Sequence, residues 1–264
     1  MIQKIDFLAP SPFELYLPEG AGPFSLICLT PILGRLFFLD DLFFERHFAK
    51  FFADNGFAAA LIDRPIFEFN PSRGLKQIQE YLEESVQRNK KVLDSLLARK
   101  EIDPKRTGSF GISFGAVANS LWAAKDARLK AHVLVLAGGN IPEIILTSRD
   151  PLMKDYLKAI IAGRCAGDDL KSALQNAIQW DPLKICSSIP RENVFLLLGI
   201  FDRVIRFRYG LDFWRVLGKP KTCFLPLGHY TTLLVAPLLK WKVLKFFRKK
   251  LGPDVPQALR LRGL

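Results

Sequence analysis

Short runs of mostly apolar residues recur along this chain and are separated by stretches with helical periodicity. The runs are FSLICL (24–29), FAAALI (57–62), TGSFGI (107–112), AHVLVLAGG (131–139), NVFLLLGIF (193–201) and TCFLPLG (222–228). Apolar runs of this length are typical of strands that are buried on both faces of a sheet. Because strands alternate with predicted helices, the pattern favours a mostly parallel sheet with helices on both faces.

The intervening stretches carry the periodicity of helices. One apolar stripe precedes the turn at Asn55-Gly56 and consists of Phe44, Phe48, Phe51 and Phe52. Further helices are predicted over about 74–99, directly after Ser113, within 140–185 and from 240 onward. The alternating segments 4–9 and 13–18 predict an antiparallel pair at the start. No repeat or Pro/Gly-rich linker divides the chain, so residues 1–264 are predicted to form a single domain.

Composition agrees with a globular protein, at 49% hydrophobic and 24% charged residues. No apolar run approaches the roughly 18 residues that a transmembrane helix needs. The first residues, MIQKIDFLAPSPFE, lack the basic and apolar regions of a signal peptide. The four scattered cysteines form no C-x-x-C pair, which favours free thiols. A cytoplasmic location is therefore predicted.

The net charge of +12 is concentrated near the C-terminus, in residues 240–252 and 258–264. A helix over the first of these segments would place four apolar residues in one stripe, namely Trp241, Leu244, Phe247 and Leu251. This pattern favours a terminal helix that docks on the core with its lysines in solvent, and it predicts no nucleic-acid partner. Weak contact of residues 240–264 with an anionic membrane is the lesser alternative.

One short pattern suggests chemistry. Gly111, Ser113 and Gly115 form a Gly-x-Ser-x-Gly arrangement between a predicted strand and a predicted helix. Asp202 and His229 each come directly after another predicted strand. Since ligands of open α/β sheets gather at the carboxyl ends of the strands, we expect these three side chains to meet at one edge.

Their chemistry is complementary. A serine hydroxyl is a weak nucleophile unless a neighbouring base accepts its proton, and His229 can serve as that base. Asp202 would hold the imidazole in the required tautomer and stabilise the imidazolium.

Each of these residues also has a structural alternative. Ser113 would then be a turn residue, Asp202 a helix cap and His229 a loop histidine. Asp181 is a rival acid, although it precedes a strand instead of following one. The remaining histidines are His132, at the start of a strand, and His47, in the Phe-rich helix; both are predicted to be structural.

The order Ser, Asp, His on a strand–elbow–helix frame resembles the α/β-hydrolase family. The segments IDPKRTGSFGISFGA, LGIFDRV and LGHYT are similar to the elbow, acid and histidine segments of esterases and dienelactone-hydrolase-like members. The resemblance implies an α/β-hydrolase fold and a serine hydrolase that cleaves a small acyl ester. A thioesterase or peptidase would use the same triad. A non-catalytic binding protein of the same fold is the alternative from another class.

The resemblance also implies an oxyanion hole. The backbone N–H of Phe114, at the start of the helix after the elbow, is the first expected donor. Many family members have His-Gly after the strand that here ends in ICLT, whereas this chain has Thr30-Pro31. Pro31 has no N–H to donate. Ile32 is therefore the candidate for the second donor, with Leu33 as the alternative.

The residues between two later strands resemble the helical cap of many α/β-hydrolases, and residues 140–185 are predicted to form this insertion. Ile144 and Tyr156 could line an apolar substrate cavity there, although their spacing fits core helices equally well. Phe37 and Phe38 are further candidates, on the acyl side. No metal-ligand spacing or phosphate-binding loop is present, so no metal or nucleotide cofactor is predicted. The pattern does not specify the oligomeric state.

Overall fold

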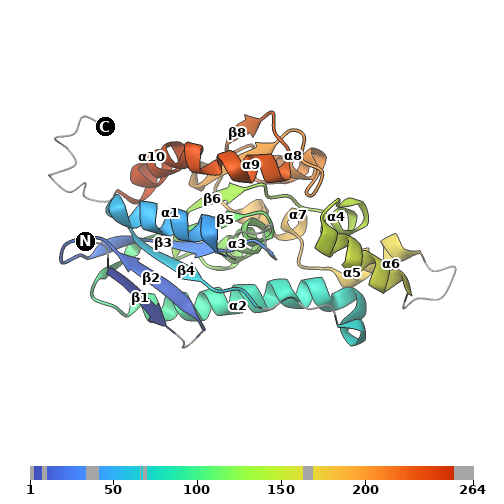
Figure 1. Ribbon diagram of the computed structural model, residues 1–264, viewed down its shortest axis with the longest axis horizontal. Coiled ribbons are helices and arrows are strands. Elements are labelled where there is room, and N and C mark those ends of the chain that lie inside the picture. Colours follow the sequence, from blue (N-terminus) through green and yellow to red (C-terminus); the bar gives the residue numbers. More distant parts are fainter. Residues whose placement is uncertain are drawn as a thin grey trace.

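A computed structural model describes residues 3–7, 11–33, 42–65, 67, 70–162 and 169–252. The strands of this part form one sheet in the order β1-β2-β4-β3-β5-β6-β7-β8 (Figure 1). They are β1 (Gln3–Phe7), β2 (Phe13–Leu17), β3 (Phe24–Thr30), β4 (Ala58–Ile62), β5 (Ile102–Ile112), β6 (Leu129–Val135), β7 (Val194–Gly199) and β8 (Lys221–Leu225). The first two strands pair antiparallel, β2 also pairs antiparallel with β4, and every other pairing is parallel.

Helices cover both faces of this sheet. They are α1 (Phe43–Asp54), α2 (Gln77–Leu97), α3 (Phe114–Lys125), α4 (Ile141–Thr147), α5 (Pro151–Ala162), α6 (Leu170–Ala177), α7 (Pro182–Ile185), α8 (Phe207–Val216), α9 (His229–Val235) and α10 (Lys240–Leu251), with short 3-10 turns η1 (Pro71–Lys76), η2 (Cys186–Ser188), η3 (Arg191–Asn193) and η4 (Ala236–Leu239). None of the described helices is both long and apolar enough to cross a bilayer.

The alternation of side chains along β3 explains the two layers. Leu26 and Cys28 belong to the core shared with α2, α3 and α8, while Ile27 and Leu29 belong to the core shared with α1 and α10. Successive side chains of a strand point to opposite faces, so a continuous apolar run supplies both cores at once. The predicted mostly parallel sheet with helices on both faces is confirmed.

The predicted apolar stripe of the last helix is only partly right. Leu244, Phe247 and Leu251 are buried on the sheet, but Trp241 is 48% exposed. Val243 and Phe246 are buried as well, because α10 packs against both the sheet and α1 and so needs a wider apolar face than one stripe.

The insertion between β6 and β7 contains α4 to α7. In Figure 1, α4, α5 and α6 lie beyond the end of the sheet, next to one end of α2. The short helix α7 is different, because it packs on α3 and α8. The insertion therefore begins and ends on the sheet and projects from it in between.

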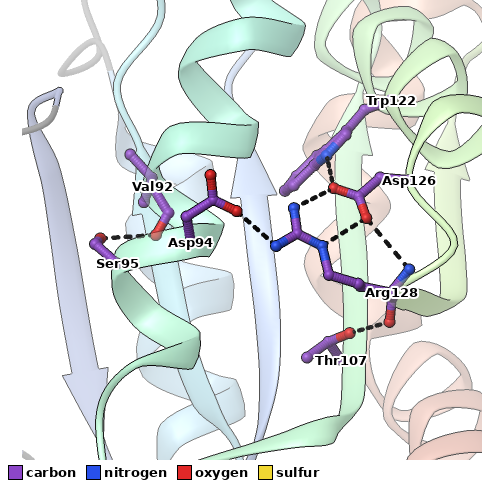
Figure 2. A network of polar contacts seen from close by, with 7 residues as sticks. All are labelled: Val92, Asp94, Ser95, Thr107, Trp122, Asp126 and Arg128. Atoms are coloured by element: carbon purple, nitrogen blue, oxygen red, sulfur yellow. Dashed lines mark hydrogen bonds and ion pairs between the residues drawn. The ribbon is translucent and has the colours of Figure 1, made fainter.

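A network of polar contacts lies at the amino ends of the parallel strands (Figure 2). Arg128 donates to both carboxylate oxygens of Asp126, at 2.8 and 2.6 Å, and to Asp94 of α2 at 2.5 Å. Trp122 of α3 also donates to Asp126. Burial by itself raises the pKa of Asp126, but the hydrogen bonds from Arg128 outweigh burial and lower it. The network ties α2, α3 and β6 together.

We expect Asp126→Asn to lower the free energy of unfolding by about 2 kcal/mol, because it leaves the paired guanidinium without its buried carboxylate. Asp94→Asn removes the exposed partner of the same arginine and should cost less than about 1 kcal/mol. Urea unfolding at neutral pH measures both values. The folded pKa of Asp126 is lowered, so its contribution is present above its ordinary value of 3.8 and is lost as the pH falls through the folded value. Equal costs for the two variants would contradict this assignment.

His132 is a second buried titratable group, 2% exposed and 3.1 Å from the Ser109 hydroxyl through its Nδ1. Burial lowers the pKa of His132 from 6.5 to about 4. Between these two pH values the unfolded chain binds a proton that the folded protein excludes, so stability falls as the pH falls.

The difference between the unfolded and folded pKa values of His132 corresponds to about 3 kcal/mol of stability lost between pH 6.5 and pH 4. His132→Asn, which keeps a polar group near Ser109, should unfold with a shallower dependence on pH across that range. His47→Asn is the comparison variant: partial burial and Lys240 lower the pKa of this exposed histidine too, without the large shift of His132, so its loss should flatten the dependence less. Denaturant unfolding at several pH values measures the slopes; an unchanged slope in His132→Asn would rule the histidine out as the source.

Candidate active site

Ser113 lies at a sharp turn between β5 and α3. Its backbone has φ 54° and ψ −125°, which is rare for a residue with a side chain. The Ser113 N–H donates to the carbonyl of Val135 at 2.7 Å, and the Ser113 carbonyl accepts from Ala116 and Val117. These bonds hold the strained residue between strand and helix, with its side chain partly exposed.

The two flanking glycines are needed because the turn is packed against backbone. A Cβ on Gly115 would lie well inside van der Waals contact of the carbonyl oxygens of Thr30 and Pro31. A Cβ on Gly111 would lie 2.7 Å from the Gly115 carbonyl oxygen and the Asn119 side-chain nitrogen. The Gly-x-Ser-x-Gly pattern thus permits α3 to start directly beside the end of β3.

Ser113, His229 and Asp202 form a hydrogen-bonded row. Ser113 Oγ lies 2.9 Å from His229 Nε2, and His229 Nδ1 lies 2.7 Å from Asp202 Oδ2. The histidine and the aspartate are each 6% exposed. The three residues come from the ends of β5, β8 and β7, which is the edge where the sequence predicts that they meet.

Asp202 holds a turn and faces His229, but it does not cap the helix α8, whose N-cap residue is Arg206. Its Oδ1 accepts from the backbone N–H groups of Val204 and Ile205, at 2.8 and 3.0 Å, while Oδ2 faces His229. The turn bonds leave one carboxylate oxygen for the imidazole and fix its direction. Capping the turn and orienting the histidine are therefore compatible in this residue.

Asp181, the rival acid, accepts hydrogen bonds at the starts of two helices. Its carboxylate accepts from the backbone N–H groups of Asn140 and Ile141 at the start of α4 and of Leu183 in α7. It therefore joins the two ends of the insertion. Its sequence signal is the Asp-Pro pair, which is common where a helix begins.

The two predicted oxyanion donors have different surroundings. Phe114 is the first residue of α3, and the first N–H that bonds back to the Ser113 carbonyl is that of Ala116. The Phe114 N–H therefore precedes the helical ladder. Ile32 N–H, in contrast, donates to Glu45 Oε1 at 3.0 Å.

Glu45 is a site neighbour that sequence reasoning missed. It lies in the first turn of α1, is 1% exposed, and burial raises its pKa despite the bond from Ile32. A glutamate in a helix is usually expected to form ion pairs at the surface. Nothing in the sequence around Glu45 therefore indicates that it is buried beside the site. The Glu45 carboxyl would have to release the Ile32 N–H before an oxyanion could accept from it.

The predicted substrate residues are less informative. Phe37 and Phe38 lie outside the described residues. Ile144 and Tyr156 are buried in the core, and the Tyr156 hydroxyl donates to the Gly74 carbonyl at 3.0 Å. Tyr156 thus connects α5 to η1. A role of these four residues in substrate binding stays a prediction.

The link between α4 and α5 contacts residues that directly follow Asp202 and His229. Tyr230, next to His229, donates to Asp150 at 2.9 Å, and the Arg149 N–H donates to the Arg203 carbonyl at 3.0 Å. Burial raises the pKa of Tyr230, and Asp150 raises it further. Sequence patterns missed these contacts because they join residues about 50 to 80 positions apart.

Comparisons with known proteins agree with the fold described above. No family model matches the sequence, and no curated protein matches it significantly. Among solved structures, it is similar to a cold-adapted esterase from an Arctic intertidal metagenomic library (16% identity, 95% of this chain and 93% of that one, TM-score 0.61) and to the alpha/beta hydrolase GrgF from Penicillium sp. sh18 (15% identity, 96% and 99%, TM-score 0.62). It is also similar to an acylaminoacyl peptidase from Pyrococcus horikoshii (16% identity, 97% and 42%, TM-score 0.69). The chain has the α/β-hydrolase fold.

Gly115→Ala tests the packing of the turn. The added methyl group meets two backbone carbonyls that cannot rotate away, so the turn must shift. We expect a loss of about 1 to 3 kcal/mol in the free energy of unfolding, as for other overpacked sites. Urea unfolding measures the loss, and a variant as stable as the wild type would show that the turn is not confined in this way.

Proposed function

We propose that this protein is a serine hydrolase that cleaves a carboxylic ester through an acyl-enzyme. The observation that supports the proposal most directly is the row of hydrogen bonds from Ser113 through His229 to Asp202. The strained turn at Ser113 adds to it, because it presents the hydroxyl at the start of a helix.

In the first half of the proposed reaction, Ser113 Oγ attacks the ester carbonyl carbon while its proton moves to His229 Nε2. Asp202 stabilises the imidazolium through Nδ1. When the carbon–oxygen bond to the alcohol breaks, His229 returns the proton to the leaving oxygen. The acyl group remains on Ser113.

In the second half, a water molecule gives a proton to His229 and attacks the acyl carbon. The bond to Ser113 Oγ breaks, Ser113 recovers its proton from His229, and the acid is released. The negative oxygen formed in each half would accept from the Phe114 N–H at the start of α3, where the helix dipole favours negative charge. The second donor would be Ile32 or Leu33, and Ile32 serves only when Glu45 releases it.

We propose an ester as the bond that is cleaved because two of the similar structures are of an esterase. Ser113, His229 and Asp202 also fit the hydrolysis of an ester. Helices α4 to α6 would act as a cap over the substrate. Their attachment to the loops of Asp202 and His229 supports this role, because movement of the cap would then reach the base directly.

Ser113→Ala should abolish labelling by a fluorophosphonate probe and lower the rate of ester hydrolysis at least about a thousandfold. The reason is that both steps need the serine oxygen. Ser120→Ala is the control, since Ser120 is a buried serine within α3 whose hydroxyl donates to the Val117 carbonyl.

Gel fluorescence with the probe and hydrolysis of p-nitrophenyl esters of increasing chain length provide the measurements. Labelling that persists in Ser113→Ala, or native protein that the probe does not label and that hydrolyses no ester, would refute the proposal. The second result would favour a non-catalytic binding protein. A thioester and an anilide of the best acyl group then test the bond type, and the ester should react fastest.

A further inference from the structure

Three large apolar side chains are exposed on consecutive turns of α9, η4 and α10. Leu234 is 62% exposed, Leu238 77% and Trp241 48%. They are spaced four and three residues apart, which places them along one side of a helical path. Exposed apolar side chains that gather in this way mark a surface for a partner or a membrane.

Cations surround these side chains. Residues 229–252 contain no Asp or Glu, while α10 alone carries six basic residues: Lys240, Lys242, Lys245, Arg248, Lys249 and Lys250. None of them forms an ion pair with a carboxylate of the described residues. The surface formed by residues 234–250 therefore combines exposed apolar groups with positive charge that no carboxylate of the described residues pairs.

A cavity of about 430 Å³ opens on the same surface, lined by Trp241, Leu244, Lys245 and Arg248. The Arg248 guanidinium donates to Asn55 Oδ1 at 3.2 Å, but its buried Nε has no partner within the described structure. A guanidinium that lines a cavity with an apolar wall is suited to an anionic headgroup whose chain lies along that wall.

The neighbouring helix α1 packs against the residues at the start of α10. Lys240 Nζ lies 4.9 Å from the centre of the Phe51 ring, and the Trp241 ring lies 5.0 Å from the same ring, edge on. In Figure 1, α9 and α10 lie end to end along one side of the molecule above α1. The exposed side chains thus sit on a rigid, packed base.

We propose that the surface of residues 234–250 docks on an anionic phospholipid membrane. Leucine and tryptophan would enter the interface while lysines contact lipid phosphates, which is the combination that interfacial helices use. A nucleic acid would use the cations but gains nothing from Leu234 and Leu238. Because α9 begins at His229, the docked surface adjoins the candidate active site. The further consequence, that acyl lipids are the substrate, rests on the proposed function, whereas docking does not.

Co-sedimentation of the full chain with large vesicles tests the proposal. We expect binding to phosphatidylcholine vesicles that contain phosphatidylglycerol, weaker binding as salt is added, and little binding to phosphatidylcholine alone. Lys242→Glu/Lys245→Glu should weaken binding at least about thirtyfold, because each lysine near such a surface contributes about 1 kcal/mol. Lys90→Glu/Lys91→Glu on α2 makes the same change in net charge and should affect binding far less.

Leu234→Ser/Leu238→Ser should weaken binding about tenfold with no loss of folding, since both side chains are exposed. Ile161→Ser, at a leucine-sized residue of α5 that is 55% exposed, is its control. Ser113→Ala should bind vesicles like the wild type, so loss of catalysis and loss of docking are separate results.

Four outcomes would overturn the proposal. They are equal binding to both vesicle types, no binding even at low salt, equal losses in the lysine variants of α10 and α2, and a concentration-dependent dimer that Leu234→Ser/Leu238→Ser dissolves. The last would assign the surface to a second copy of this chain. Binding of inorganic phosphate, measured by calorimetry, without any vesicle binding would assign the cavity to a free anion.

Discussion

The close approach of the α3 start to the end of β3 is the constraint on which the candidate site depends. Only a residue without a Cβ fits at position 115, against the carbonyls of Thr30 and Pro31. This contact lets the helix begin immediately after Ser113, and the short turn forces that serine into a positive φ. Strain at one residue is held by hydrogen bonds to the neighbouring strand and to the helix. The position of the hydroxyl is therefore a consequence of packing between glycine and backbone.

The other two members of the row are held by loops that also bind the insertion. Asp202 has one oxygen in its own turn and one on His229, so its direction is set before any ligand arrives. The segment between α4 and α5 bonds to the carbonyl of Arg203 and to the hydroxyl of Tyr230. The residues that directly follow Asp202 and His229 thus bond to the same segment. Glu45 adds a buried carboxyl at the Ile32 N–H, where an oxyanion would otherwise be expected.

Charge is distributed unevenly over the fold. At the amino ends of the parallel strands, Arg128 is satisfied by Asp126 and Asp94, so that the cation stabilises the packing of helices on the sheet (Figure 2). On α10 the cations have no carboxylate partners in the described structure, and apolar side chains are exposed between them. Basic residues thus form internal ion pairs in the first region and an outward-facing charged surface in the second.

The sequence by itself determined the layers and the edge at which Ser113, Asp202 and His229 meet. Short continuous apolar runs that alternate with helical periodicity are typical of strands covered on both faces, and residues that follow parallel strands share one edge. Tertiary structure alone decided the exposure of Trp241, the bonds from the start of α4 to Asp181 and the partner of the Ile32 N–H. These depend on contacts between segments far apart along the chain, such as Glu45 with the end of β3 and Asp150 with Tyr230. Local periodicity carries no information about such pairs, because it reports which face of an element is apolar and not what lies against it.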